Sequence, residues 1–176
     1  MGLVHIYCGD GKGKTSAAVG LAVRAAGCGK RVVIARFLKT DNSGEVEILK
    51  KIPEVTLIPC RKTFGFVRSM DEETKRECAA YHRELFVEVV KLAEHADLVV
   101  FDEIMAAVNY GMVPERDVLE FLENRPGRDQ TDGLEIVLTG RDPSEKLIAA
   151  ADYVSEICKR KHPFDRGIMA RRGVEY

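Results

Sequence analysis

The sequence predicts an α/β fold, a three-layer sandwich in which helices cover both faces of a mainly parallel sheet. Three observations predict this class. Apolar runs of strand length alternate with helical stretches, as in chains where right-handed crossovers join parallel strands. The apolar runs are nearly continuous, which is typical of strands buried on both faces. A glycine-rich loop joins the first apolar run to an alanine-rich stretch, and this arrangement is typical of a phosphate-binding loop.

The predicted strands are short apolar runs, and helical stretches lie between them. The strands cover residues 3–7, 31–38, 55–58, 98–101, 135–138 and 153–157. The helices cover residues 15–26, rich in alanine, 71–95, with apolar side chains at helical spacing, 114–123, which opens with proline, and 144–151, which follows an Asp-Pro pair. In a sheet of this kind, ligands gather at the carboxyl ends of the strands.

The composition indicates one globular domain. A chain of 176 residues is long enough for one well-buried core and too short for two domains of ordinary size, so we expect a single domain over residues 1–176. Hydrophobic residues make up 45% of the chain and charged residues 31%, a globular balance. The formal net charge of −1 gives no reason to expect a nucleic-acid or membrane surface.

The sequence carries no targeting signal. It has neither an apolar run of membrane-spanning length nor a secretory leader at its start, so we expect a cytoplasmic protein. The cysteines are odd in number and form no C-x-x-C pair, which argues against a disulfide framework and against a zinc site. We expect most of them to be small core residues; they are Cys8, Cys28, Cys60, Cys78 and Cys158.

Residues 8–15 read Cys-Gly-Asp-Gly-Lys-Gly-Lys-Thr. In such a loop, backbone N–H groups converge on phosphate oxygens and the following helix N-terminus adds partial positive charge. Lys14 would reach the far phosphates, and the hydroxyl of Thr15 suits a Mg²⁺ ion. The strict pattern G-x-x-x-x-G-K-[ST] has glycine where this chain has Cys8, so the flanking strand and helix carry the assignment. Lys12 either touches phosphate or points into water.

Polar residues follow two further strands at the same rim. Asp102 and Glu103 end a buried strand, where carboxylates can bind Mg²⁺ or its water, although acidic residues also cap helices. The sequence does not rank the two carboxylates. Arg141 follows the strand 135–138 and could brace phosphate charge with its planar fork of donors, or simply be a surface arginine near a helix start.

Phe64 and Phe66 lie in an unusual segment between a strand and a long helix. Residues two apart in an extended segment point the same way, so both rings could form a platform for a large flat ligand. The alternative is an apolar anchor that pins the loop against the helix 71–95. The four histidines show no shared metal spacing.

In these motifs the chain resembles the ATP:corrinoid adenosyltransferases of the CobA/BtuR type, and the resemblance covers nearly its whole length. The resemblance rests on residues 7–16, 36–39, 102–104, 139–141, 161–168 and 173–176. The segment Lys-His-Pro-Phe-Asp-Arg-Gly-Ile at 161–168 is the most specific, since generic phosphate-loop proteins lack it. The resemblance implies a RecA-like P-loop domain that works as a homodimer. A Co(I) corrinoid attacks C5′ of ATP, and inorganic triphosphate leaves.

The resemblance also implies roles for residues. Lys14 and Glu103 would be catalytic. Thr15 and Glu103 would be the Mg²⁺ contacts, with Asp102 either supporting them from behind or serving as the alternative ligand. Phe64 and Phe66 would meet the lower face of the corrinoid and exclude its axial ligand. The ATP-binding residues would be Gly9, Asp10, Gly11, Lys12, Gly13, Lys14, Thr15, Ser16 and Arg141. A reductase or reduced flavoprotein would supply electrons.

The chain differs from the family pattern in three ways that bear on the site. The chain has no tryptophan, and Phe66 stands where many relatives have one. Asp10 stands where asparagine is frequent, and its carboxylate would bring negative charge close to the phosphates unless it turned outward or bound a neighbour. The chain begins almost at its first strand, whereas longer members carry an N-terminal extension over the site. We therefore expect a more open nucleotide site or a substitute covering segment.

Other readings of the same loop differ in their products. A generic P-loop ATPase or small-molecule kinase would yield ADP, whereas the adenosyltransferase yields triphosphate and a light-sensitive organometallic product. A nucleotide switch protein lacks support, because the N-K-x-D guanine signature is missing. A corrinoid-binding protein without turnover is disfavoured by the intact Lys14, Thr15 and Glu103.

Overall fold

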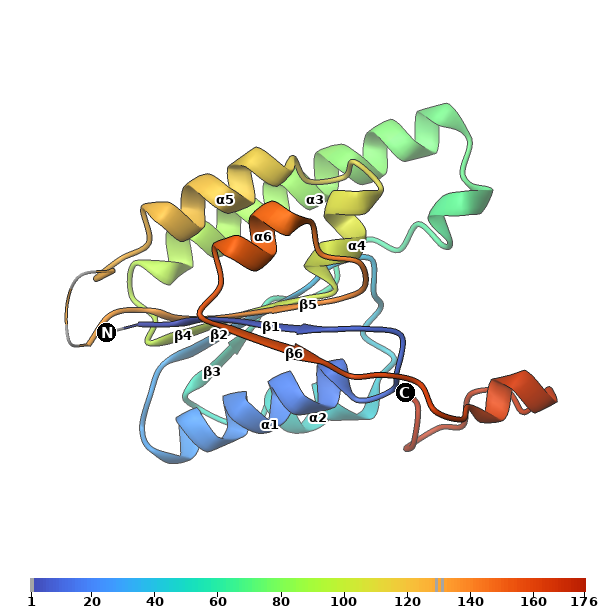
Figure 1. Cartoon of the computed structure of the whole chain (residues 1–176), viewed down its shortest axis with the longest axis horizontal. Coiled ribbons are helices and arrows are strands. Elements are labelled where there is room, and N and C mark those ends of the chain that lie inside the picture. The colour runs from blue at the N-terminus through green and yellow to red at the C-terminus, as the bar shows by residue number, and fades with distance from the viewer. Residues whose placement is uncertain (1, 129, 131) are drawn as a thin grey trace.

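The computed structural model describes residues 2–128, 130 and 132–176, and its centre is a parallel sheet (Figure 1). All neighbouring strands are parallel, in the order β3-β2-β4-β5-β1-β6. The strands are β1 (Val4–Cys8), β2 (Val32–Arg36), β3 (Val55–Leu57), β4 (Leu98–Asp102), β5 (Glu135–Thr139) and β6 (Tyr153–Glu156). Each predicted strand is found within two residues of its expected bounds, and the predicted parallel α/β class is confirmed.

The four predicted helices are present, together with two that the sequence did not predict. The helices are α1 (Lys14–Gly27), α2 (Gly44–Leu49), α3 (Glu72–Ala93), α4 (Ile104–Asn109), α5 (Glu115–Glu123) and α6 (Glu145–Ala149), with 3₁₀ turns η1 (Val67–Ser69) and η2 (Pro163–Arg166). The two unpredicted helices, α2 and α4, have six residues each. That is too short for a helical apolar period to show in the sequence.

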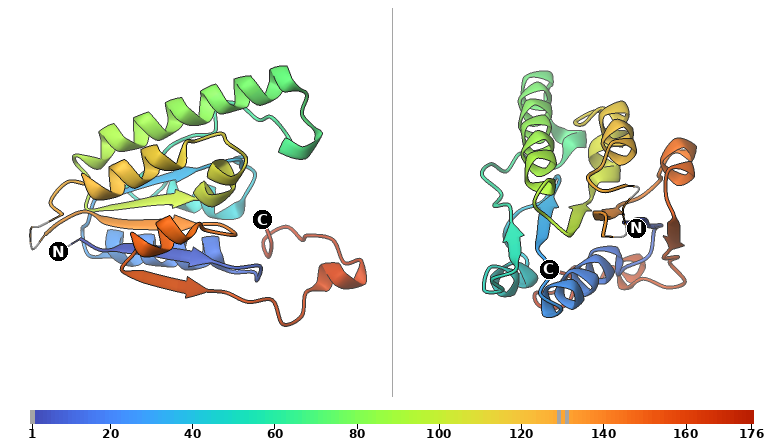
Figure 2. Two further views of the ribbon diagram at one scale, coloured as in Figure 1. Left: turned by 45° about the horizontal axis from the view of Figure 1, so that its top comes forward. Right: turned by 90° about the vertical axis from the view of Figure 1, so that its left-hand side faces the viewer.

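The helices form two layers, one on each face of the sheet. Helices α1 and α2 lie on one face, and α3, α4, α5 and α6 lie on the other (Figure 1, Figure 2). The small side chains Ala18, Ala22 and Ala26 are four residues apart and let α1 pack closely on β2 and β4. On the opposite face, the ring of Phe101 packs against Phe86 and Phe121, at centroid distances of 5.7 and 5.6 Å.

The expectation that most cysteines are core residues is wrong. Only Cys8 and Cys78 are buried, whereas Cys60 is half-buried and Cys28 and Cys158 are exposed. Cys28 follows the last turn of α1, and Cys158 lies beyond β6, so neither position faces the sheet. Among the described residues, no helix combines the length and the apolar character needed to cross a membrane.

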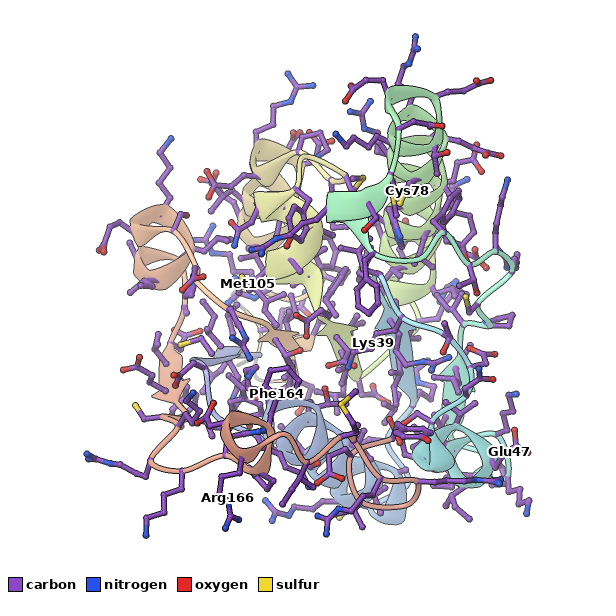
Figure 3. The ribbon with its side chains drawn as sticks, turned by 90° about the vertical axis from the view of Figure 1, so that its right-hand side faces the viewer. Lys39, Glu47, Cys78, Met105, Phe164 and Arg166 are labelled. Carbon is purple, nitrogen blue, oxygen red and sulfur yellow. The ribbon has the colours of Figure 1, made fainter. Side chains whose placement is uncertain are left out.

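The carboxyl ends of the strands meet at one end of the molecule, which Figure 3 faces. After β6 the chain leaves the sheet, forms η2 and returns across this end (Figure 2, Figure 3). This C-terminal segment, residues 157–176, lies beside the loop between β1 and α1. The amide of Gly11 donates a hydrogen bond to the carbonyl oxygen of Ile157 at 2.7 Å.

Candidate functional site

The loop between β1 and α1 owes its shape to its glycines. Gly13 has φ of 123°, a conformation that side chains rarely adopt, directly before the first turn of α1. Gly11 passes so close to the C-terminal segment that an added Cβ would lie 2.6 Å from the carbonyl oxygen of Ile157. The loop therefore needs glycine at one position for its backbone angles and at the other for close approach.

Lys14 begins α1 and bends back over the loop. Its Nζ donates to the carbonyl oxygen of Gly11 at 2.8 Å. Burial lowers the pKa of Lys14, the nearby Arg141 lowers it further, and the carboxylate of Glu103 opposes both effects. Lys14, Glu103 and Arg141 line a cavity of about 310 Å³ above the loop. Lys12 lines the same cavity, which therefore offers three cationic side chains to an anionic ligand.

A hydrogen-bond network joins the loop to the end of β4. The Thr15 hydroxyl donates to Asp102 Oδ1 at 3.0 Å, and the Thr139 hydroxyl donates to the same oxygen at 2.7 Å. Lys39 Nζ lies 2.7 Å from the Thr15 hydroxyl and 2.5 Å from Asp102 Oδ2. Asp102 is only 2% exposed, so this buried carboxylate is compensated by one ammonium and two hydroxyls.

The donor set of this network fits a hard divalent cation. Thr15 and Asp102 present oxygen atoms, and the Lys39 ammonium already places a positive charge between them. No cluster of three or more His, Cys, Asp or Glu side chains with metal-binding geometry occurs among residues 2–128, 130 and 132–176. A site of one or two protein oxygens is the kind that Mg²⁺ shares with a phosphate ligand and water.

Glu103 differs from its neighbour Asp102 in both backbone and surroundings. Its φ is 62°, in the left-handed region, where it ends β4 and precedes α4. Its amide donates to the Thr139 hydroxyl at 2.8 Å, which fixes this turn. Glu103 lines the cavity above the loop, whereas Asp102 accepts a hydrogen bond from the Thr15 hydroxyl.

Asp10 turns away from the phosphate side of the loop. Its Oδ1 accepts a hydrogen bond from the backbone amide of Lys159 at 2.8 Å, and this bond lowers the pKa of Asp10. Of the two arrangements that would keep this charge from the phosphates, the structure shows the bond to a neighbour. Arg141 approaches the same residue from the other side, with Nη2 3.4 Å from the Asp10 carbonyl oxygen.

Cys8 stands where the strict loop pattern has its first glycine. The side chain is buried at the end of β1, and burial raises the pKa of the thiol. A thiol that stays protonated is a poor nucleophile. Cys8 is therefore a packing residue at the base of the loop.

Phe64 and Phe66 lie in different environments. Phe64 packs against Tyr81 and His82 of α3, with ring centroids 5.6 and 6.4 Å apart, and Lys62 Nζ lies 5.1 Å from the centroid of Phe64. Phe66 is 87% exposed. Gly65 between them has φ of 82°, so the segment is not extended at this point. Phe64 fits the anchor interpretation, and Phe66 alone is free to meet a ligand.

Both rings line a cavity of about 370 Å³ that also includes Lys39, Thr40 and His82. Lys39 and Thr40 also line a neighbouring cavity of about 790 Å³, whose wall includes Thr15 and Ser16 of the loop. The labelled Lys39 lies near the middle of the carboxyl end of the sheet in Figure 3. The cavity beside the loop and the cavity beside the aromatic rings are therefore neighbours at the end of β2.

The sequence matches a family model, described as ATP:corrinoid adenosyltransferase BtuR/CobO/CobP, over residues 1–176. This chain belongs to that family. It is 34% identical to a corrinoid adenosyltransferase of Escherichia coli strain K12, over 99% of this chain and 86% of the relative. It is 33% identical to the corrinoid adenosyltransferase CobA of Salmonella typhimurium, with the same coverage. A corrinoid adenosyltransferase of Pseudomonas aeruginosa is 32% identical, over 99% of this chain and 84% of the relative.

The structure of this adenosyltransferase family member brings together most of the residues that we expect to bind ATP. Around the cavity above the loop lie residues 10–16, Glu103 and Arg141. Asp102 lies below, bonded to Thr15. Phe64 and Phe66 lie apart from these residues, beside the second cavity.

Sequence reasoning assigned no role to three residues of this site, although each lies in a segment that carries the family resemblance (36–39, 139–141 and 173–176). Lys39 contacts Thr15 and Asp102, and its place after β2 at the rim was the available signal. Thr139 bonds both Asp102 and the amide of Glu103. Glu175 reaches the loop from the far end of the chain, and its spacing from the loop carries no sequence signal.

Proposed function

We propose that this protein transfers the 5′-deoxyadenosyl group of ATP to the Co(I) centre of a corrinoid, in the biosynthesis or salvage of adenosylcobalamin. Membership of the ATP:corrinoid adenosyltransferase family supports the reaction. The structural observation that carries the proposal is the position of Lys39 and Thr40, which line both the cavity beside the phosphate loop and the cavity beside Phe66. Two large substrates bound in these cavities would meet at the end of β2.

The triphosphate of ATP would bind to the loop through the backbone N–H groups at the start of α1. Lys14 and Arg141 would both place cationic groups on the phosphates in this cavity. Lys12 and Ser16 would contact the outer phosphate oxygens. The residues proposed to bind ATP are Gly9, Asp10, Gly11, Lys12, Gly13, Lys14, Thr15, Ser16 and Arg141, with Asp10 contributing its backbone, since its side chain is bonded to Lys159.

In the reaction, the cobalt lone pair forms a bond to C5′, and the bond from C5′ to the triphosphate oxygen breaks. The electron pair of that bond goes to the leaving triphosphate, so negative charge grows beside the loop. Lys14 would stabilise this charge, and Glu103 would favour the protonated form of Lys14. Mg²⁺, held by Thr15, Asp102 and Glu103, would supply further positive charge to the leaving group.

The aromatic rings would receive the flat corrinoid. Phe66 is exposed at the mouth of its cavity and would cover the lower face of the ring system, which excludes an axial ligand. Phe64 would support the loop from behind through its contacts with α3. A reductase or reduced flavoprotein would supply the electrons that give Co(I). We further propose a cytoplasmic homodimer.

The test is an anaerobic incubation of the protein with ATP, Mg²⁺ and chemically reduced cob(I)alamin. We expect a photolabile adenosylated product in the visible spectrum and inorganic triphosphate in equal amount. Formation of ADP instead would indicate a P-loop ATPase or small-molecule kinase. Formation of neither product would indicate a binding protein without turnover.

A further inference from the structure

The carboxylate of Glu175 lies inside the cavity above the phosphate loop. It shares the cavity wall with Lys14, Arg141 and His162. Its side chain is 18% exposed, and Oε1 accepts a hydrogen bond from Lys12 Nζ at 3.0 Å. A negative group thus stands in the space proposed for a triphosphate.

Glu175 is held in place by its own segment. Its Oε2 accepts hydrogen bonds from the Arg171 amide at 2.8 Å and from Arg171 Nε at 3.1 Å, and its Oε1 accepts one from Arg171 Nη2 at 3.0 Å. These bonds from Arg171, together with Lys12, lower the pKa of Glu175 to about 2. The carboxylate is therefore charged at every pH at which the protein would work.

The rest of the segment is tied to the loop as well. The amide of Gly11 donates to Ile157, and the amide of Lys159 donates to Asp10 at 2.8 Å. The hydrogen bonds at residues 157 and 159 join the start of the segment to the loop, and the ion pair at residue 175 joins its end to the same loop. Hydrogen bonds to the backbone of the segment therefore help to hold Glu175 beside the loop.

Lys12 is the group for which Glu175 and a phosphate would compete. It belongs to the phosphate loop, is largely exposed and has Glu175 as its ion-pair partner. A phosphate that takes Lys12 must displace the carboxylate or lie beside it, and like charges in a partly enclosed cavity repel. The competition is strongest for the ligand with the most negative charge.

We propose that Glu175 competes with bound phosphates for Lys12 and thereby favours the release of inorganic triphosphate over the release of ATP. The inference rests on the function proposed above. Cleavage of the C5′–O bond leaves its electron pair on the triphosphate, so the fully ionised product carries one more negative charge than the same phosphates carry in fully ionised ATP. Repulsion from Glu175 therefore weakens the binding of the product more than that of the substrate.

The experiment measures binding of inorganic triphosphate and of ATP to the full chain by calorimetry, with Mg²⁺ present. For Glu175→Gln we expect triphosphate to bind about threefold to tenfold more tightly, with a smaller gain for ATP, as expected from removing one partly screened charge. Glu175→Asp keeps the charge and should stay near the wild-type values. Asp165→Asn removes a carboxylate of the same segment that pairs with Lys159 at 3.1 Å, and it should change neither affinity.

A double-mutant cycle separates competition for Lys12 from a general effect on the segment. In a Lys12→Gln background, Glu175→Gln should tighten triphosphate binding much less than it does in the wild type. Equal or weaker triphosphate binding by Glu175→Gln, with the wild type binding normally, would overturn this inference alone. Wild-type protein that binds neither triphosphate nor ATP would instead overturn the proposed function of the loop, and with it the inference.

Discussion

The Thr15 hydroxyl donates a hydrogen bond to the buried carboxylate of Asp102 at 3.0 Å and accepts one from the Lys39 ammonium at 2.7 Å. This relationship joins the first helical turn after the phosphate loop to the end of the central strand β4. The ammonium of Lys39, which follows β2, thus occupies the space between two of the oxygen donors that we propose for Mg²⁺.

Lys39→Met should tighten divalent cation binding. Removal of the ammonium frees Thr15 and Asp102 for a cation, so we expect Mn²⁺ to bind about threefold to tenfold more tightly in the presence of ATP, as measured by electron paramagnetic resonance titration. Without a cation, the buried carboxylate of Asp102 loses an ion partner, and the free energy of unfolding should fall by about 1–3 kcal/mol. Lys146→Met, an exposed change on α6, is the control. Unchanged Mn²⁺ affinity in Lys39→Met would contradict a cation site here.

Lys14→Ala should nearly abolish adenosyl transfer. The variant lacks the ammonium that lies beside the Gly11 carbonyl in the triphosphate cavity, so both ATP binding and stabilisation of the leaving group are lost. We expect kcat/KM to fall by about 100-fold to 1,000-fold, measured with chemically prepared Co(I) so that reduction is not limiting. Turnover equal to that of wild type would refute the assignment of the phosphate loop.

Phe66→Ala should reduce turnover, whereas Phe64→Ala should reduce stability. Phe66 is exposed, so its loss should leave the melting temperature unchanged while reducing turnover more from Co(II) with a biological reductant than from chemically prepared Co(I). Phe64 packs against Tyr81 and His82, so its loss should lower the free energy of unfolding by about 1–3 kcal/mol. If Phe66→Ala reduced both reactions equally, the ring would have no role in excluding the lower ligand.

His82 should make the stability of the protein sensitive to mild acid. The imidazole is 3% exposed, its Nδ1 has no hydrogen-bond partner among the described residues, and burial lowers its pKa from 6.5 to about 4. Between these two values the unfolded chain binds a proton that the folded protein does not, so this contribution is fully present above pH 6.5 and is lost as the pH falls towards 4. We expect a loss of about 1–2 kcal/mol between pH 7 and pH 5.

The measurement is urea unfolding of the wild type and of His82→Leu across this pH range. His82→Leu should show a smaller fall in the free energy of unfolding between pH 7 and pH 5, whatever its stability at pH 7. His95→Leu changes an exposed histidine just beyond α3 and should keep the wild-type slope. A slope that is the same in His82→Leu and wild type would show that His82 titrates normally.

Much of the fold could be predicted because burial on both faces makes the strands almost continuously apolar. Val99 and Val100, for example, point to opposite faces of β4 and are both buried. The location of the site could also be predicted from the topology, since the carboxyl ends of parallel strands bring Thr15 and Asp102 to one end of the sheet. Short elements escaped prediction, because six residues of α4 give no helical period.

The arrangement of side chains at the site depended on features that sequence spacing does not contain. The positive φ of Gly65 breaks the extended path between two phenylalanines, so that Phe64 packs on α3 while Phe66 stays exposed. The contact between Lys12 and Glu175 joins positions 163 residues apart. Such a pairing depends on the path of the whole C-terminal segment, which local propensity does not determine.

The hydrogen bond from the Gly11 amide to Ile157 gives the protein a built-in spectroscopic probe. One backbone proton belongs to the phosphate loop and is shielded by the C-terminal segment. Its exchange rate with solvent deuterium therefore reports, at a single resonance, whether nucleotide binding lifts the segment from the loop or holds it down. Comparison of that rate in the free protein, with ATP and with triphosphate would show which ligand the segment covers.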